Sequence, residues 1–204
     1  MKNKSRVGIF GGTFNPPHNG HVSVAEQFSK ALELDKLFVI PDYIPPHKEY
    51  AGNVTPQQRL EMCERAFSHI DRAVVSDWEI RREGKSYTYL TLEEFSSKDR
   101  DLFFLCGTDM FLTLDSWRCP EKIFKLATIC YVRRENDPGN TELIDFAAKK
   151  YIDSFDAKIF CLPVKAIEAS SSEIRDDLAN GNGEKQALLP SGVLEYIKEQ
   201  GLYV

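Results

Sequence analysis

Short apolar segments that alternate with stretches of helical periodicity most constrain what this chain can fold into. The segments predicted to be strands are 7–10, 37–40, 73–76, 102–106, 129–132 and 159–162. Most are continuous apolar runs, which is typical of strands that are buried on both faces. Helical patterns are found at 22–34, 56–70, 88–95, 143–151, 171–179 and 193–200. Thr55 can cap the second of these, and Gln58 would complete a capping box. We therefore predict an α/β protein with a Rossmann-like, doubly wound parallel sheet and helices on both of its faces.

The length and charge of the chain limit its organisation and its partners. Its 204 residues suit one domain. We expect a single domain over 1–204, with a C-terminal helical part over about 165–204. The 31 acidic residues outnumber the 26 basic ones, and the net charge is −5. This charge argues against general binding of nucleic acid or anionic membranes, but a small anionic ligand needs only a few cationic groups.

The sequence also predicts a cytoplasmic location. No apolar run reaches the about 18 residues that a membrane span needs, and residues 1–6 lack the apolar stretch of a secretory signal. The five cysteines are scattered singly with no C-x-x-C pair, so we expect reduced thiols. Membranes and nucleic acid are not expected partners, and a homo-oligomer is left open.

The segment that follows the first predicted strand carries the strongest functional signal. It reads G-G-T-F-N-P-P-H-N-G-H from Gly11 to His21. Two glycines let the backbone approach a bulky ligand, and the start of the next helix presents N–H groups that favour phosphate. His18 and His21 can both donate to such a phosphate. The G-x-G-x-x-G fingerprint and the Walker phosphate loop are absent, which argues against a dehydrogenase and an ordinary kinase.

Two other roles are open to these histidines. A metal pair would need a third ligand, such as a nearby Cys or Asp, and the local chain offers none. We therefore predict no protein ligands for a metal ion. An isolated histidine is by default a cap or a core group, but a Gly-Gly-Thr loop after a buried strand favours a role in phosphate binding.

These motifs resemble a known superfamily. G-G-T-F-x-P-x-H-x-G-H is similar to the signature of the adenylyl- and cytidylyltransferases, which use H-x-G-H. The segment from Ser170 to Arg175 resembles their S-S-T-x-I-R motif, with Ser172 in place of Thr. The segments P-P-H-K, S-Y-T and G-T-D-M, the last followed by a tryptophan, resemble the bacterial nicotinate-nucleotide adenylyltransferases. That family more often has Ala or Ser at the position of Thr108.

The resemblance implies a reaction. AMP would pass from ATP to nicotinate mononucleotide, giving nicotinate adenine dinucleotide (deamido-NAD) and pyrophosphate in NAD biosynthesis. The acceptor phosphate would attack the α-phosphorus directly, in line and without a covalent enzyme intermediate. Its second pKa of about 6 leaves it largely ionised at pH 7, so no general base is needed. Mg²⁺ is expected on the phosphates of the substrate rather than on protein ligands.

The resemblance also implies which residues form the site. The residues expected to stabilise the transition state are His18, His21 and Arg175. The residues expected to bind ATP are Gly11, Gly12, Thr13, Phe14, Gly20, Ser171 and Ser172. The residues expected to bind the acceptor are Lys48, Tyr87, Thr88, Asp109, Trp117 and Arg134, and Arg133 is left as an alternative to Arg134.

Several of these assignments state a specific contact. The Thr13 hydroxyl is expected to donate to the phosphates, and Gly20 to leave space for the nucleotide. Trp117 would stack on the nicotinate ring, with a core or surface role as its alternative. A ribose hydroxyl is assigned to Asp109, whose alternative is a helix cap. The serines from 170 to 172 could form only a capping box with Glu173.

Two other functions remain open at this point. One is a sister adenylyltransferase whose acceptor is nicotinamide mononucleotide or phosphopantetheine. The other is a nucleotide-binding sensor without catalysis, although the presence of both histidines and Arg175 argues against a dead site.

Overall fold

The computed structural model describes residues 4–46, 54–132, 139–163, 167 and 169–204. By its internal contacts the chain forms two compact units. The first comprises Met1–Phe10, Gln27–Leu37 and Tyr87–Ala166. The second comprises Gly11–Glu26, Phe38–Ser86 and Ile167–Val204. The single domain expected from the sequence stays a prediction.

The strands form one parallel sheet with the order β3-β2-β1-β4-β5-β6. Their bounds are β1 (Ser5–Gly12), β2 (Lys36–Pro41), β3 (Ala73–Val75), β4 (Arg100–Cys106), β5 (Ala127–Val132) and β6 (Ile159–Leu162). Each strand matches a predicted apolar segment. This order is that of a doubly wound Rossmann sheet, in which the order of the strands reverses between β1 and β4 while all strands stay parallel. The predicted fold class is therefore confirmed.

The longer helices are those that the sequence predicts. They are α1 (Asn19–Ala31), α2 (Pro56–Phe67), α4 (Thr88–Phe95), α7 (Gly139–Phe155), α8 (Ser171–Ala179) and α9 (Ser191–Gln200). Short helices were missed, because so few residues carry little periodicity: α3 (Trp78–Arg82), α5 (Thr108–Phe111), η1 (Leu114–Ser116), α6 (Pro120–Leu126) and η2 (Gln186–Leu188). Within the described ranges, no helix has the length and apolar character that a membrane crossing requires.

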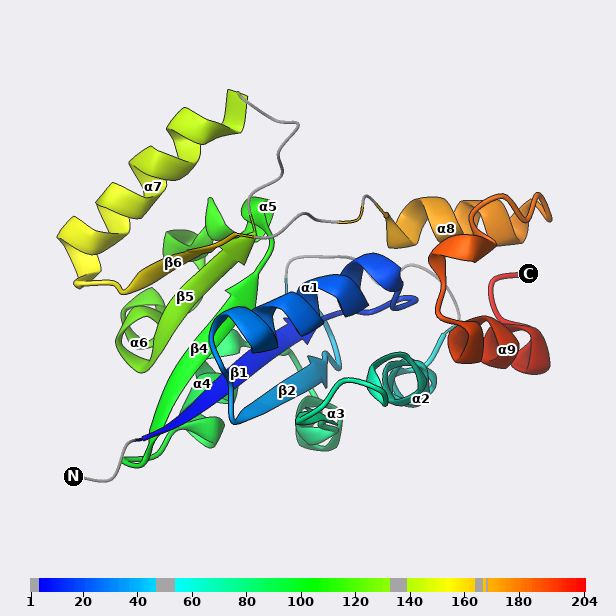
Figure 1. Cartoon of the computed structure of the whole chain (residues 1–204), viewed down its shortest axis with the longest axis horizontal. Helices are drawn as coiled ribbons and strands as arrows, with labels where there is room; N and C mark the ends of the chain where they lie inside the picture. Colours follow the sequence, from blue (N-terminus) through cyan, green and yellow to red (C-terminus); the bar gives the residue numbers. More distant parts are fainter. Residues whose placement is uncertain (1–3, 47–53, 133–138, 164–166, 168) are drawn as a thin grey trace. The chain divides into compact units, whose positions relative to one another are not determined.

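The first unit is built around β4, β5 and β6, which run side by side in Figure 1. An aromatic cluster joins β5 to the neighbouring helices. The ring of Phe111 stacks on that of Tyr131 at a centroid distance of 4.4 Å. The Tyr151 hydroxyl donates to the Phe111 carbonyl at 2.8 Å, which ties α7 to α5. The hydroxyl of the buried Tyr151 thus has a hydrogen-bond acceptor within the apolar cluster that packs its ring.

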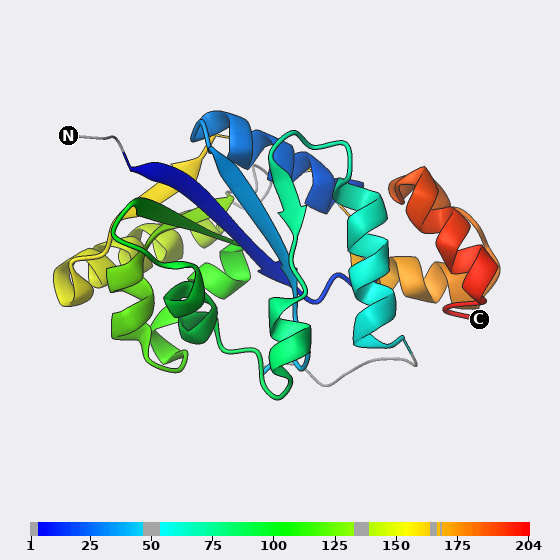
Figure 2. The same ribbon diagram turned by 90° about the horizontal axis from the view of Figure 1, so that it is seen from below.

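In the second unit, α2 packs against α9 (Figure 2). The predicted capping box at the start of α2 is confirmed. The Gln58 backbone N–H donates to the Thr55 hydroxyl at 3.2 Å, and the Thr55 N–H donates to the Gln58 side chain at 2.9 Å. At the other end of the contact, the guanidinium of Arg65 lies 4.8 Å from the ring centre of Tyr196. The capping box explains why α2 begins where the sequence predicts, and the Arg65–Tyr196 contact packs α2 against α9.

One glycine of β1 is required by close packing. A Cβ added at Gly8 would lie 2.5 Å from Leu34 Cδ1 and 2.8 Å from Phe28 Cε1. Both neighbouring side chains are buried, so neither can move into solvent. A methyl group at this position would therefore force the core of the first unit to rearrange.

We expect Gly8→Ala to lower the free energy of unfolding by about 1–3 kcal/mol, as overpacking of a filled core does. Gly192→Ala is a matched control, because the added Cβ would meet Arg65 Cβ at an ordinary 3.6 Å. This control lies in α9, where alanine is the better helix former, and should leave stability unchanged or raise it slightly. Urea denaturation of both variants measures the difference. Equal stability of Gly8→Ala and the unmodified protein would contradict the close approach.

Candidate active site

Two histidines at the start of α1 hold one another in place. The His18 backbone N–H donates to Nδ1 of His21 at 3.2 Å, and the His21 backbone N–H donates to Nδ1 of His18 at 3.3 Å. Their rings stack with centroids 3.6 Å apart. The helix begins at Asn19, between the two residues, so the turn that starts the helix also pairs the rings.

These reciprocal bonds determine the hydrogen positions on the rings. Since each Nδ1 accepts a hydrogen bond, each neutral ring carries its hydrogen on Nε2. Burial lowers the pKa of His18 from 6.5 to about 4, opposed in part by a backbone hydrogen bond. His18 is therefore neutral at pH 7 and offers an Nε2–H donor. Such a donor suits a phosphate oxygen.

The loop before the histidines is shaped by Phe14 and Gly12. Phe14 has a backbone φ of 48°, and its buried ring meets the His21 ring edge-on at 5.1 Å. A Cβ added at Gly12 would lie 3.0 Å from the Phe14 ring. A Cβ added at Gly11 would meet nothing within 4 Å, and Gly11 is exposed, so a ligand can approach it.

The space at Gly20 is used by the protein itself. An added Cβ would lie 2.9 Å from the Ile167 carbonyl oxygen and 3.0 Å from Nδ1 of His18. The expectation that Gly20 leaves room for a nucleotide stays a prediction, because these distances concern only the side of Gly20 on which a Cβ would lie. What this glycine permits is close packing of the backbone at Ile167 and of the His18 ring against the start of α1.

The second motif is tied to the first. Ser171 donates its hydroxyl hydrogen to the Pro16 carbonyl at 2.9 Å, and Arg175 Nη1 donates to the Asn15 carbonyl at 2.8 Å. The helix α8 thus contacts the loop of the histidines through both side chains. Ser170, the residue that precedes α8, makes no side-chain cap bond. The alternative of a mere capping box is not found.

The sequence gives no signal for one further contact to this loop. The Tyr203 hydroxyl donates to Oδ1 of Asn15 at 2.6 Å. Asn15 is buried, so this bond satisfies the hydrogen-bonding capacity of an amide oxygen that water does not reach. The loop is therefore held from α8 and from the residues that follow α9.

Thr13 is placed differently from the prediction. Its hydroxyl donates to Oδ2 of Asp42 at 2.8 Å, so this hydrogen is not directed to a phosphate. Asp42 is in turn paired with Arg59, which is fully buried. Sequence reasoning missed both charged residues, although Arg59 lies within the apolar pattern of a predicted helix.

The predicted acceptor residues that the structure describes lie in the first unit. Thr88 begins α4, and Tyr87 precedes it. The half-buried Trp117 donates from Nε1 to the Thr113 hydroxyl at 3.3 Å. Asp109 is exposed in α5, where the N-cap is Gly107, so the alternative role as a cap is not found. Lys48, Arg133 and Arg134 lie outside the described residues.

Two neighbours of these residues were not expected. The guanidinium of Arg118 lies 5.0 Å from the ring centre of Tyr87, which places a positive charge beside the start of α4. The hydroxyl of Thr108, the residue at which the sequence departs from the motif it resembles, donates to the Val132 carbonyl at 2.6 Å. The hydroxyl that Thr108 adds at this position therefore has a hydrogen-bond acceptor at the end of β5.

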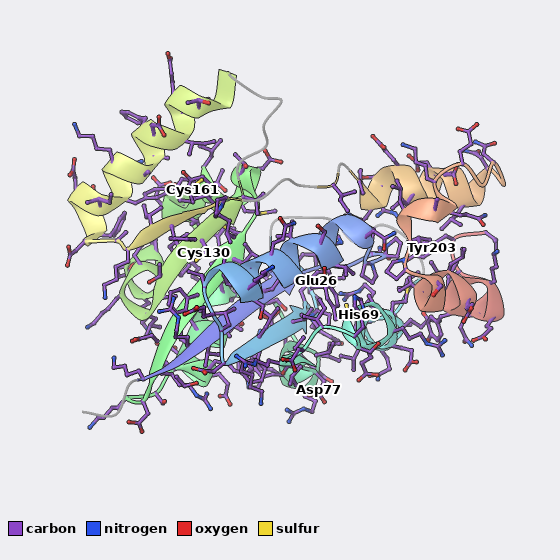
Figure 3. All side chains as sticks on the ribbon, in the orientation of Figure 1. Glu26, His69, Asp77, Cys130, Cys161 and Tyr203 are labelled. Carbon is purple, nitrogen blue, oxygen red and sulfur yellow. The ribbon has the colours of Figure 1, made fainter. Side chains whose placement is uncertain are left out.

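The structure also describes titratable groups that the sequence did not assign to the site. His69 contacts Glu26 at 3.2 Å between exposed side chains (Figure 3). The five cysteines are free: Cys63, Cys106 and Cys130 are buried, and Cys161 is exposed. Among the residues that the structure describes, no group of three or more His, Cys, Asp or Glu side chains could hold a metal ion.

The fold and the two linked motifs define the class of the protein as a nucleotidyltransferase of the H-x-G-H kind. A family model described as Cytidylyltransferase-like matches residues 9–177. A probable nicotinate-nucleotide adenylyltransferase of Clostridium acetobutylicum is 38% identical and covers 100% of both chains. One from Citrifermentans bemidjiense is 38% identical over 98% of each chain. The chain therefore belongs to the cytidylyltransferase-like family and, within it, to the nicotinate-nucleotide adenylyltransferases.

A solved structure agrees on the fold. Plasmodium falciparum nicotinic acid mononucleotide adenylyltransferase complexed with NaAD matches with a TM-score of 0.75. The match covers 98% of this chain and 97% of that chain at 18% identity. At this identity the likeness concerns the fold alone.

The lowered pKa of His18 makes a prediction about stability and pH. The unfolded chain takes up the proton near pH 6.5, whereas the folded protein does so only near pH 4. Stability is therefore lost as the pH falls from 6.5 towards 4, by roughly 3 kcal/mol at most. His18→Gln should remove this part of the loss, as measured by urea denaturation at pH 7 and pH 4.5. An unchanged difference between the two pH values would contradict the neutral, buried ring.

Proposed function

We propose that this protein transfers AMP from ATP to nicotinate mononucleotide, giving nicotinate adenine dinucleotide and releasing pyrophosphate. The observation that carries the proposal is the pair His18 and His21, whose reciprocal bonds place the hydrogen of each neutral ring on Nε2. The names of relatives such as that of Clostridium acetobutylicum support the choice of acceptor.

The histidine pair suits a reaction in which charge moves onto a leaving pyrophosphate. Donors that are already oriented stabilise the developing charge without a cost of reorganisation at the moment of reaction. His18 is buried and neutral, so its Nε2–H lies in surroundings where a hydrogen bond is stronger than in water. We assign both rings to the oxygens of the triphosphate.

Arg175 and the serines complete the proposed ATP site. Arg175 uses Nη1 on the Asn15 carbonyl, and a guanidinium has further N–H groups that can bind the β- and γ-phosphates. Ser171 and Ser172 begin α8, whose N–H groups favour an anion. The accessible backbone at Gly11 is where we expect the nucleotide to approach.

The acceptor assignments remain part of the proposal. Trp117 would stack on the nicotinate ring, and its Nε1–H bond to Thr113 would fix the orientation of the indole. Tyr87 and Thr88 would offer backbone N–H groups and a hydroxyl to the carboxylate. Asp109 would bind a ribose hydroxyl, and Lys48 and Arg134 would bind the acceptor phosphate.

The reaction itself needs little covalent chemistry from the protein. An oxygen of the acceptor phosphate forms a bond to the α-phosphorus of ATP, and the bond from that phosphorus to the bridging oxygen of pyrophosphate breaks. The attacking phosphate is already largely ionised at pH 7, so no proton has to be removed. The contribution of the protein is to position two anions and to stabilise charge on the leaving group.

We also propose that Mg²⁺ binds through the substrate. The donor set around the histidine loop consists of imidazole N–H, guanidinium and hydroxyl groups, which suit phosphate oxygens. Mg²⁺ prefers oxygen ligands and keeps several waters, so phosphate oxygens would hold it. When bound, it supplies positive charge to the β- and γ-phosphates. A cytoplasmic location also stays a prediction, and the oligomeric state stays open.

Pyrophosphate release with ATP and Mg²⁺ tests the acceptor. We expect nicotinate mononucleotide to be preferred over nicotinamide mononucleotide on the order of 100-fold or more, because the amide leaves donors for a carboxylate unpaired. Equal rates would keep the adenylyl transfer but overturn the acceptor. No release with either compound, nor with phosphopantetheine, would overturn the proposed function.

Replacing His18 tests the role of the pair. We expect His18→Ala to lower kcat on the order of 100-fold or more, because an oriented donor is lost. The exposed His69 provides a matched control, and His69→Ala should keep the unmodified kcat. Circular dichroism checks that both variants fold. A kcat that is unchanged in His18→Ala would contradict the assignment.

A further inference from the structure

Arg59, a fully buried arginine of α2, contacts the Gly-Gly-Thr loop at residues 11–13. The side chain of Arg59 is 0% exposed, and that of its partner Asp42 is 11% exposed. Arg59 Nη1 and Asp42 Oδ1 are 3.0 Å apart. A buried ion pair of this kind is costly to form unless each group is also hydrogen-bonded, so its surroundings indicate what it does.

Arg59 binds the backbone of two different loops. Its Nη1 also donates to the Thr13 carbonyl at 2.8 Å, after β1. Its Nη2 donates to the carbonyls of Asp42 at 2.6 Å and Tyr43 at 3.3 Å, after β2. The Asp42 N–H donates to the Gly12 carbonyl at 3.0 Å, which joins the same two loops. The Arg59 side chain and this backbone bond together hold the Gly-Gly-Thr loop against the end of β2.

The charge of Asp42 has a consequence for an anionic ligand. Its Oδ2 accepts the hydroxyl hydrogen of Thr13 at 2.8 Å, so a carboxylate lies one hydrogen bond away from a loop that is assigned to a triphosphate. An unpaired negative charge there would repel that ligand, and burial would strengthen the repulsion. The guanidinium of Arg59 balances this charge at the carboxylate itself.

We propose that Arg59 is a positioning residue for ATP binding. It holds the Gly-Gly-Thr loop through the Thr13 carbonyl and neutralises Asp42, so that a nucleoside triphosphate can bind beside a carboxylate. Thr13 then meets the phosphates through its backbone N–H, since its hydroxyl is bound to Asp42. This inference rests on the proposed function.

Two single substitutions separate this role from a merely structural one. Arg59→Met should weaken ATP binding, whereas Asp42→Asn should leave it unchanged or strengthen it. Arg59→Met leaves the charge of Asp42 unbalanced, and we expect the KM for ATP to rise about 10-fold or more. Asp42→Asn has the same shape, and its amide oxygen still accepts from Arg59. We expect this variant to bind ATP as well as the unmodified protein or better, even where its stability is lower.

The double variant Arg59→Met with Asp42→Asn completes the cycle. Without a charge on either partner, the KM for ATP should lie well below that of Arg59→Met alone. Arg65→Met is the matched control on the same helix, since Arg65 is partly exposed and pairs with Glu61 on the surface. It removes the same charge and should leave both KM and kcat unchanged.

The KM for ATP and kcat are measured at saturating acceptor, and calorimetric titration with ATP gives a binding constant independent of turnover. A 10-fold weaker affinity for ATP in Asp42→Asn would overturn the inference, and this variant decides the question if Arg59→Met does not fold. An unchanged KM for ATP in folded Arg59→Met would overturn it as well. If the unmodified protein itself neither binds ATP nor releases pyrophosphate, it is the proposed function that fails.

Discussion

The site depends on the two backbone-to-ring hydrogen bonds between His18 and His21. Each bond uses a backbone N–H at the start of α1 and fixes the orientation and the tautomer of the other ring. The neighbouring packing follows from this arrangement. Gly20 has to be small because the His18 ring and the Ile167 carbonyl lie against it, and Phe14 supports the His21 ring from the side.

A second constraint concerns the carbonyl oxygens of the same loop. Those of Thr13, Asn15 and Pro16 accept hydrogen bonds from Arg59, Arg175 and Ser171 respectively. Carbonyl oxygens repel an anionic ligand, so their engagement by protein donors favours phosphate binding at the loop. Arg175 therefore has two roles in this account, since one N–H group orders the loop and others are assigned to the phosphates. The H-x-G-H and S-S-x-x-I-R segments act as one unit for this reason.

What the sequence could predict depends on how far apart along the chain the interacting residues lie. Apolar runs and local caps act over a few residues, and so every strand and the capping box of Thr55 and Gln58 were found. The Thr13 hydroxyl was assigned to phosphate because its partner, Asp42, follows another strand and leaves no trace in local spacing. Arg59 lies one helical turn before the buried Cys63. This spacing indicates that the charge of Arg59 lies on the apolar face of the helix, but it does not identify the residue that pairs with Arg59. Contacts between distant segments needed the structure.

The tautomeric state of the two rings can be measured directly. It can be read from the ¹⁵N chemical shifts of the histidine side chains at pH 8, before and after addition of a non-hydrolysable ATP analogue. Both rings should carry their hydrogen on Nε2, with Nδ1 unprotonated, and the Nε2 signals should move when the analogue binds. A hydrogen on Nδ1 of either ring, or Nε2 signals that do not move at saturating analogue, would contradict the assignment of both rings to the oxygens of the triphosphate.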